Sequence, residues 1–503
     1  MPICKQRWIQ QFYNFKINKM KKIFTYAALF AVGCMSIISC SKDDEPKINY
    51  SDAPMSNTEL KAILVEKGFT FDAEGKLEIN ELVDSTTALD LSGSKLTNFE
   101  GVEMLPNLVE LDLSNNGYGP VFDMATLPKQ ITAVDLTDNK IYDYEGLVDV
   151  KMENDARNTT VLRAFTKLYV PAESKFNVED LMPYFEKNGS TTDMKMADAE
   201  GAMQAYNTLR EIPDAEFRAF LQTLYSSVFE GDNINISKYV DFSEAGGTVD
   251  FSASQESPFS SIEGLEYFIN NPFYPAYDIQ ADLDDIYPMN KKTISYLTPR
   301  GNIKNICLVN VNTNGIDLSK ATSVANAVIY YDDNIESIDL SNTLISRQSE
   351  NNRESFDGSI MIHHCPKLKS IKLAEEQEGI LRIMSLIDLP LLEEFDMSQI
   401  TALYDLYLYV LPNTRIIYPT SLKVMLNDNS LTDLGTIKYH PVRPGVVVGY
   451  ETLRVSITED VYNEAFVKFV NDMGKNDRGS NLSPNSFSFD YPDYELVQSW
   501  YKN

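Results

Sequence analysis

Three segments of the chain share one pattern: TTALDLSGSKL (86–96), LVELDLSNN (108–116) and ITAVDLTDNKI (131–141). In each segment aliphatic residues alternate with polar ones around a central Asp. Because successive side chains of a strand point to opposite faces, this period of two predicts a short strand with one buried face. In the second segment, Leu111 and Leu113 are expected to face the core and Asp112 the solvent.

The spacing and the turn residue make the pattern a repeat. Leu113 follows Leu91 by 22 residues, and Leu136 follows Leu113 by 23. Each of these leucines is followed, three positions later, by Ser94, Asn116 or Asn139. A polar side chain at that position can bond backbone groups where the chain leaves the strand.

A looser series runs through the second half, where each unit offers two short apolar runs. The first runs of the units are Ile306–Leu308, Ala327–Ile329, Ile360–Ile362, Leu381–Ile383 and Leu406–Leu408. The second runs are GIDLS (315–319), IESIDLS (335–341), LKSIKL (368–373) and LEEFDM (392–397). Two strands in each unit predict two sheet faces, and the polar stretch 341–358 is expected to be a surface loop.

Each of the two repeat series is preceded by a similar segment, which we call its lead-in. Residues 57–82 and 212–237 each predict an amphipathic helix, and each is followed by a shared phrase, FEGVEML (99–105) or IEGLEYF (262–268). The open ends of a repeat stack need polar-faced caps, a role that these helices suit. A further helix at 177–187 is expected to close the first series, and residues 188–198 to form a linker. Another helix is expected at 459–473.

Together these motifs resemble the leucine-rich repeat, whose units run about 20–29 residues, as found in surface lipoproteins of Bacteroidetes. The resemblance implies an α/β repeat fold: a leucine-rich repeat solenoid of short parallel strands with small helical caps. The expected domains are a signal peptide (1–39), a lipidated tether (40–56), a first cap and repeat block (57–190), a second helical cap (200–255), a second repeat block (256–440) and a C-terminal cap (441–503).

The amino-terminal stretch MKKIFTYAALFAVGCMSIISC (20–40) has a basic start, a short apolar run and a small residue before Cys40. That is the pattern of a signal peptide, and the run is short for a membrane-spanning helix of about 20 residues. Residues 37–40 resemble a bacterial lipobox, which implies that Cys40 carries the lipid and that Met20 is the initiator. The acidic stretch 41–45 resembles an export tag, the alternative being a plain acidic tether. We therefore expect an outer-membrane lipoprotein facing the cell exterior.

The composition of the chain limits the kinds of partner and site that we expect. The formal net charge is -29, and hydrophobic residues make up 43% of the 503 positions. Such an acidic chain repels phosphate backbones, so nucleic acid is a poor partner. Of the five cysteines only Cys307 and Cys365 lie beyond residue 40, both in apolar strand patterns, so we expect buried thiols rather than a disulfide or a metal site.

Catalytic motifs are missing from the sequence: it has no nucleophile elbow, zinc-binding helix or phosphate-binding loop. We expect a non-enzyme without cofactor or metal. The residues from Thr70 to Glu81 have a spacing similar to that of a calcium-binding loop, but Thr70 stands where an Asp is usual. A structural cap is the preferred interpretation. The aspartates Asp90, Asp112 and Asp135 are expected to form one solvated column.

A row of side chains is the candidate binding site. The outward positions of the first runs in the second series are expected to be Val309, Tyr330, His363, Met384 and Tyr409, with Tyr407 two residues before the last. Exposed aromatic and methionine side chains in a row suit contact with protein or glycan. The alternative is that a loop or neighbouring domain covers them, and the polar column Asp339, Lys372 and Asp396 is an equally available surface.

Two functions follow from these expectations. One is a surface binding or adhesion module that recognises an extracellular protein or glycan through one face of the repeats. The other is a non-catalytic accessory or structural lipoprotein of a carbohydrate-uptake system. In both, the lipid on Cys40 attaches the protein to the bilayer.

Overall fold

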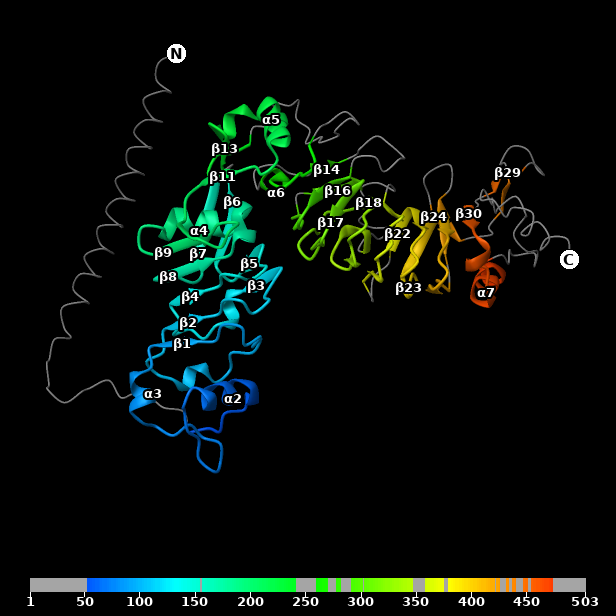
Figure 1. Ribbon diagram of the computed structural model, residues 1–503. Coiled ribbons are helices and arrows are strands. Elements are labelled where there is room, and N and C mark those ends of the chain that lie inside the picture. Colours follow the sequence, from blue (N-terminus) through cyan, green and yellow to red (C-terminus); the bar gives the residue numbers. More distant parts are fainter. Residues whose placement is uncertain are drawn as a thin grey trace, which may run out of the picture. The chain divides into compact units, whose positions relative to one another are not determined.

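The computed structural model describes residues 52–153, 156–240, 259–269, 277–281, 291–301, 303–346, 358–374, 379–420, 422–425, 431–433, 437–439, 447–450 and 454–473. Residues 1–53 and 54–503 form two units, and every described helix and strand lies in the second. That unit has a mixed α/β fold, with mostly parallel strands in several sheets and few helices (Figure 1).

The first sheet consists of β1 (Ala88–Asp90), β2 (Glu110–Asp112), β4 (Ala133–Asp135), β8 (Lys167–Val170), β9 (Asp193–Ala197) and β10 (Met203–Ala205), in that order. Its strands are parallel except at the last pair. Beside it lie the parallel pair β3 (Val121–Asp123) and β5 (Asp143–Glu145) and the antiparallel pair β6 (Val148–Glu153) and β7 (Ala156–Val161). The three quoted segments therefore form neighbouring strands, as predicted.

The predicted register of these strands is confirmed. Asp90, Asp112 and Asp135 are direct partners across β1, β2 and β4. Leu111 and Leu113 are fully buried, and Asp112 between them is half-buried. Each aspartate accepts a hydrogen bond from the backbone N–H two residues later, and Asp112 Oδ1 lies 3.0 Å from the nitrogen of Ser114. The aspartate column thus holds the turns that follow the strands.

The turn asparagines also act as predicted. Asn139 is 1% exposed, and its amide group donates to the carbonyls of Leu113 and Leu136 at 3.0 and 2.9 Å. Its Oδ1 accepts the N–H of Asn116 at 2.9 Å. Asn116 repeats these contacts one unit earlier. The asparagines thereby pair buried backbone groups of two successive turns, which would otherwise be costly to bury.

The second half contains a nine-stranded sheet. Its strands are β14 (Tyr277–Ala281), β16 (Ile303–Val309), β18 (Asn326–Tyr330), β20 (Ser359–His363), β22 (Gly379–Ile387), β24 (Ile400–Tyr409), β26 (Lys423–Met425), β27 (Leu431–Asp433) and β30 (Arg454–Ile457). All pairs are parallel except β26 with β27, and β30 pairs with β24. The strands from β14 to β24 lie side by side (Figure 1).

The second apolar runs form smaller sheets. β19 (Ser337–Asp339), β21 (Ser370–Lys372), β23 (Glu394–Asp396) and β25 (Arg415–Ile417) are parallel. The remaining strands are β15 (Lys292–Ile294) with β17 (Val311–Thr313), β28 (Ile437–Tyr439) with β29 (Val447–Tyr450), and β11 (Leu209–Glu211), β12 (Phe229–Glu230) and β13 (Asn233–Asn235). The prediction of two strands in each unit is confirmed.

The helices lie mainly in the predicted segments. The α-helices are α2 (Thr58–Glu66), α3 (Glu81–Ser85), α4 (Leu181–Asn188), α5 (Ala215–Leu224), α6 (Leu265–Ile269) and α7 (Glu464–Met473). The 3-10 helices are η1 (Val102–Met104), η2 (Met124–Thr126), η3 (Ala172–Phe176), η4 (Ser226–Val228), η6 (Leu344–Ser346) and η7 (Glu459–Val461). Helices α2 and α5 occupy the two lead-ins.

The two shared phrases have the same local structure. Gly101 and Gly264 both adopt a left-handed backbone, with φ of 100° and 103°. The N–H of each glycine is bound by the glutamate two residues later: Gly101 by Glu103 at 3.0 Å and Gly264 by Glu266 at 2.6 Å. A Cβ on Gly264 would lie 2.3 Å from Ile212. The left-handed backbone of this turn therefore favours glycine, and the N–H of that glycine needs the glutamate two residues later as its acceptor.

The predicted linker at 188–198 is wrong. Residues 193–197 form β9, which pairs in parallel with β8, and Met194 and Ala197 are buried. Helix α4 therefore connects two strands of the sheet and does not close it. The apolar core also continues past this point, because Phe176 and Met182 belong to the same buried cluster as Ile212.

The register yields a stability test. The variant Leu113→Asp places a charge at the fully buried position that directly follows β2, and we expect a loss of about 3 kcal/mol or more in the free energy of unfolding. The control Asp112→Asn keeps an acceptor for the N–H of Ser114 and should cost about 0.5 kcal/mol or less. Urea unfolding of both variants measures the difference. Equal losses would mean that the register is mistaken.

Candidate functional site

The nine-stranded sheet carries two buried columns on one face. They run across the strands in direct register from β16 to β30. The first column is Ile306, Ala327, Ile360, Met384, Leu406 and Val455, and the second is Leu308, Ile329, Ile362, Leu386, Leu408 and Ile457. Every one of these side chains is at most 3% exposed. This face therefore belongs to the core, and the alternate residues of each strand form the other face.

On the opposite face, two columns define what we call the outer face of the sheet. The middle column is Cys307, Val328, Met361, Ser385 and Tyr407, and the end column is Val309, Tyr330, His363, Ile387 and Tyr409. The side chains of Val328, Tyr330, Met361, His363 and Tyr407 are half-buried. The predicted candidates Tyr330, His363 and Tyr407 thus lie on one face.

Tyr330 and His363 form a stacked pair at the centre of the end column. Their ring centroids lie 4.1 Å apart with an angle of 8° between the ring planes. His363 Nε2 is 2.7 Å from Ser385 Oγ, and the hydroxyl of Tyr330 donates to Met361 Sδ at 3.7 Å. Burial lowers the pKa of His363 to about 3, so its ring is neutral at physiological pH. The pair is a planar, uncharged surface.

A second stack, which was not predicted from the sequence, lies one residue further along the chain. Tyr331 and His364 stack with centroids 4.5 Å apart and an angle of 4°. His364 Nδ1 is 2.9 Å from Asp388 Oδ2. Tyr331, His364 and Asp388 all have a left-handed backbone, with φ between 53° and 59°. The adjacent pairs Tyr-Tyr and His-His at the ends of two aligned runs were the signal for this stack.

The prediction for Met384 is wrong. Its side chain is fully buried and in register with Ile360 and Leu406 of the core column. The prediction aligned residues 381–383 with 360–362, whereas the structure pairs residues 384–386 with them. A shift of three positions, an odd number, moves each side chain to the opposite face. Ile387 occupies the place in the end column that had been assigned to Met384.

The prediction for Tyr409 is only half right. Tyr409 lies in the end column as predicted, but its side chain is 7% exposed. Strand β30 extends the sheet beyond β24, and the following Thr458 accepts the N–H of Val410 at 2.8 Å. The ring of Tyr407 remains half-buried and contacts that of Tyr409 edge to face, 6.2 Å between centroids. Val309, at the other end of the column, is also buried.

The other candidate positions have structural explanations. Asp72 of the calcium-loop-like segment accepts the N–H groups of Glu74 and Lys76 at 2.8 and 2.9 Å, so its carboxylate holds a turn. Cys307 and Cys365 form no disulfide with each other; Cys365 is buried as predicted, whereas Cys307 in the middle column is only partly buried. Cys40 lies outside the described residues. In the part of the chain that the structure describes, no helix has the length and apolar character needed to span a membrane.

No protein-family model, curated protein or solved structure that we compared with the chain matches it.

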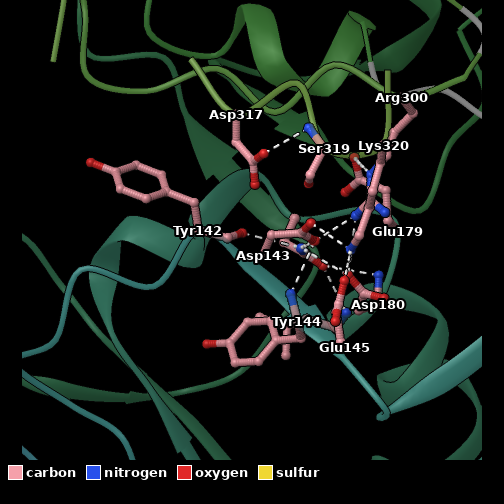
Figure 2. A network of polar contacts seen from close by, with 12 residues as sticks. Tyr142, Asp143, Tyr144, Glu145, Glu179, Asp180, Arg300, Asp317, Ser319 and Lys320 are labelled. Atoms are coloured by element: carbon pink, nitrogen blue, oxygen red, sulfur yellow. Dashed lines mark hydrogen bonds and ion pairs between the residues drawn. The ribbon is translucent and has the colours of Figure 1, made fainter. Parts of the chain in front are cut away.

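A buried ion network forms the second notable cluster (Figure 2). The carboxylate of Asp143, whose side chain is 2% exposed, is bound by Arg300 and by Lys320, the latter at 2.8 Å. Arg300 also lies 3.4 Å from Asp180 and 3.7 Å from Glu179. The three acids come from the first half of the chain and the two bases from the second. This network could not be predicted from the sequence, because its members are far apart in the chain and share no motif.

The pKa values of the three acids in this network are shifted in different directions. Despite its burial, Arg300 and Lys320 hold the pKa of Asp143 below its ordinary value. Burial, together with the charge of Asp143, raises the pKa of Asp180 well above its ordinary value. Burial raises the pKa of Glu179 to about 7, against the attraction of Arg300. The two bases of the network therefore favour the charged form of Asp143, whereas burial disfavours the charged forms of Asp180 and Glu179.

Glu179 makes the stability of the fold depend on pH. Its pKa is about 7 in the folded protein against an ordinary value of 4.5. The folded state binds this proton more tightly, so the contribution is full below about pH 4.5 and is lost as the pH rises to about 7. Glu179→Gln should reduce the fall in unfolding free energy between about pH 5 and pH 8 by about 1 kcal/mol or more, since one pKa unit is worth about 1.4 kcal/mol.

Urea unfolding at the two pH values measures this fall in the wild type and the variant. The matched control is Glu145→Gln, because Glu145 touches the same network through Lys320 but has a side chain that is 50% exposed. An identical pH dependence in the wild type and Glu179→Gln would contradict the assignment.

Proposed function

We propose that the protein is a lipid-anchored leucine-rich repeat protein of the bacterial cell surface, which binds an extracellular protein or glycan through the outer face of the nine-stranded sheet. Three recurring features support the repeat assignment. They are the aspartate that holds each turn after a DLS-type strand, the asparagines that bridge successive turns, and the direct parallel register. No catalytic role is proposed.

The observation that carries the binding site is the uncharged aromatic character of the outer face. With His363 neutral, the middle and end columns contain no charged side chain from β16 to β24. The acidic residue on this face of β24 is Asp405, two residues before Tyr407, and it is 3% exposed. The chain as a whole has a net charge of -29. Depletion of charge and enrichment in aromatic residues and Met are typical of the centre of a binding interface. A neutral partner can cover this face without the cost of burying an unpaired charge.

The stacked rings suit this role for a further reason. Tyr330 and His363 hold each other in place, and His363 is fixed by Ser385, so their rings lose little conformational freedom on binding. Aromatic side chains of this kind provide much of the energy at binding hot spots. Tyr407, two strands away in the middle column, extends the same surface.

The double variant Tyr330→Ala, Tyr407→Ala tests the site. We expect at least about a tenfold loss of affinity, equal to about 1.4 kcal/mol, for any partner found on a glycan array or an extracellular-matrix panel. The melting temperature should fall by no more than a few degrees, because both rings are half-buried. The control is Tyr239→Ala, since Tyr239 is 53% exposed and lies outside the sheet. Unchanged binding by the double variant would rule out the outer face.

The anchor is tested separately. Cys40→Ala should abolish labelling with radioactive palmitate and leave the precursor unprocessed, because the Cys40 thiol is the proposed acceptor of the lipid. Cys34→Ala, six residues earlier in the same apolar run, should label as the wild type does. Label in the Cys40 variant would disprove the lipobox. Replacement of Lys42, Asp43 and Asp44 should leave labelling intact but hide the protein from protease added to whole cells.

A further inference from the structure

A small cavity lies between the two halves of the chain, beside the ion network. Its volume is about 20 Å³, and one side of it is open to solvent. A water-sized group needs about 10–15 Å³. The cavity therefore has room for a single group of that size, and a chain attached to that group would extend toward the open side.

Aromatic rings form one side of the cavity. Tyr142 and Tyr296 stack with centroids 4.8 Å apart and an angle of 25° between the planes. Phe176, which is 4% exposed, also lines the cavity. Tyr142 precedes β5 and Tyr296 follows β15, so the two halves of the chain contribute one ring each to the stack. Aromatic rings attract cations through their negative faces and pack well against methylene groups.

Carboxylates form the other side, and one of them has a buried oxygen without a hydrogen-bond partner. Glu266 is 9% exposed, and no described Lys, Arg or His forms an ion pair with it. The Oε1 atom of Glu179 is buried without a hydrogen-bond partner, as is the facing Nε of Arg300. These two atoms are 3.7 Å apart, too far for a direct hydrogen bond. Glu173 also lines the cavity.

The first shared phrase shows that the turn itself does not require this burial. Glu103 binds the N–H of Gly101 as Glu266 binds that of Gly264, yet Glu103 is exposed. What differs is the surroundings: Glu266 is enclosed beside Tyr142, Tyr296 and Glu179. Burial and the nearby Glu263 raise the pKa of Glu266 well above its ordinary value, against a smaller lowering by Lys175.

The aromatic rings and carboxyl groups that line the cavity indicate the class of ligand that it can bind. An anion would lie against three acidic side chains, Glu173, Glu179 and Glu266, whereas a cation would favour the charged form of each. A metal ion needs several close ligands, and the described residues contain no group of three or more His, Cys, Asp or Glu side chains placed to hold one. A cation with N–H donors fits both the carboxylates and the rings. An –NH₃⁺ group is about the size of a water molecule and donates three hydrogen bonds.

We propose that this cavity binds the primary ammonium group of a small amine. The ammonium donates to the carboxylates of Glu179 and Glu266, and the carbon chain attached to it packs against Tyr142 and Tyr296. This site is distinct from the outer face of the sheet, and the inference does not depend on the proposed function.

Calorimetric titration of the full chain with cadaverine and with glucosamine tests the proposal and separates a linear amine from an amino sugar. We expect saturable binding of at least one of them with one site per chain. Tetramethylammonium, which has no N–H donor, and 1-pentanol, which has no charge, should not compete. Absence of saturable binding by both amines would overturn the proposal.

Two variants locate the site. Glu266→Gln keeps an oxygen to accept the N–H of Gly264 but removes the charge, and it should weaken binding at least about tenfold. The matched control Glu103→Gln makes the same change in the exposed phrase and should leave the affinity unchanged. Equal losses in both would show general electrostatic attraction and overturn the proposal. If Glu266→Gln lowers the melting temperature strongly, Tyr296→Leu provides a second variant with the same expectation.

One more variant distinguishes an external ligand from an internal one. The ammonium of Lys175 lies 5.3 Å from the centroid of Phe176, a ring that lines the cavity. If the wild type binds no amine but Lys175→Met does, the ammonium of Lys175 already occupies the cavity and the proposal fails. We expect the wild type to bind the amine and Lys175→Met to bind it at least as tightly.

Discussion

The structure depends on pairing the backbone polar groups at the corners where the chain leaves its parallel strands. A buried N–H or C=O without a partner costs about 1–3 kcal/mol, and each short strand is followed by such a corner. Side chains solve the problem in three ways. Aspartates accept the N–H two residues later, as Asp112 does from Ser114. Asn116 and Asn139 bridge successive corners. Arg163 donates to a group of carbonyls, those of Met124, Leu127, Pro128 and Ile131.

The same constraint explains what could be predicted from the sequence. The strands around Leu111 and Leu113 and the bridging role of Asn139 were predictable because one segment of about ten residues contains both the alternation and the turn residue. The two lead-in helices and the shared phrases were predictable for the same reason. In all these cases the physical cause lies within a short stretch of sequence or repeats at a fixed spacing.

Features that depend on pairing between distant segments were predicted less well. The run from Leu381 to Met384 is apolar at almost every position, so the sequence did not show which residues pair with Ile360, and Met384 was assigned to the wrong face. The polar residues 188–192 suggested a linker, but β9 follows at once. The ion network around Asp143 joins residues more than a hundred positions apart. Single charged residues carry no information about such partners.

The long connection between β18 and β20 has a consequence for how this protein can change. Residues 341–358 lengthen one unit, yet the strands on both sides keep their alignment: Ile329 pairs with Ile362, and Ile338 with Ile371. The entropic cost of closing a loop rises only slowly with its length. Added sequence length between residues 346 and 358 is therefore compatible with the register of both sheets, whereas the preceding Thr343 and Ile345 are fully buried. The corners held by aspartates and asparagines do not offer this freedom, so variation in length and engineered fusions belong in the connection.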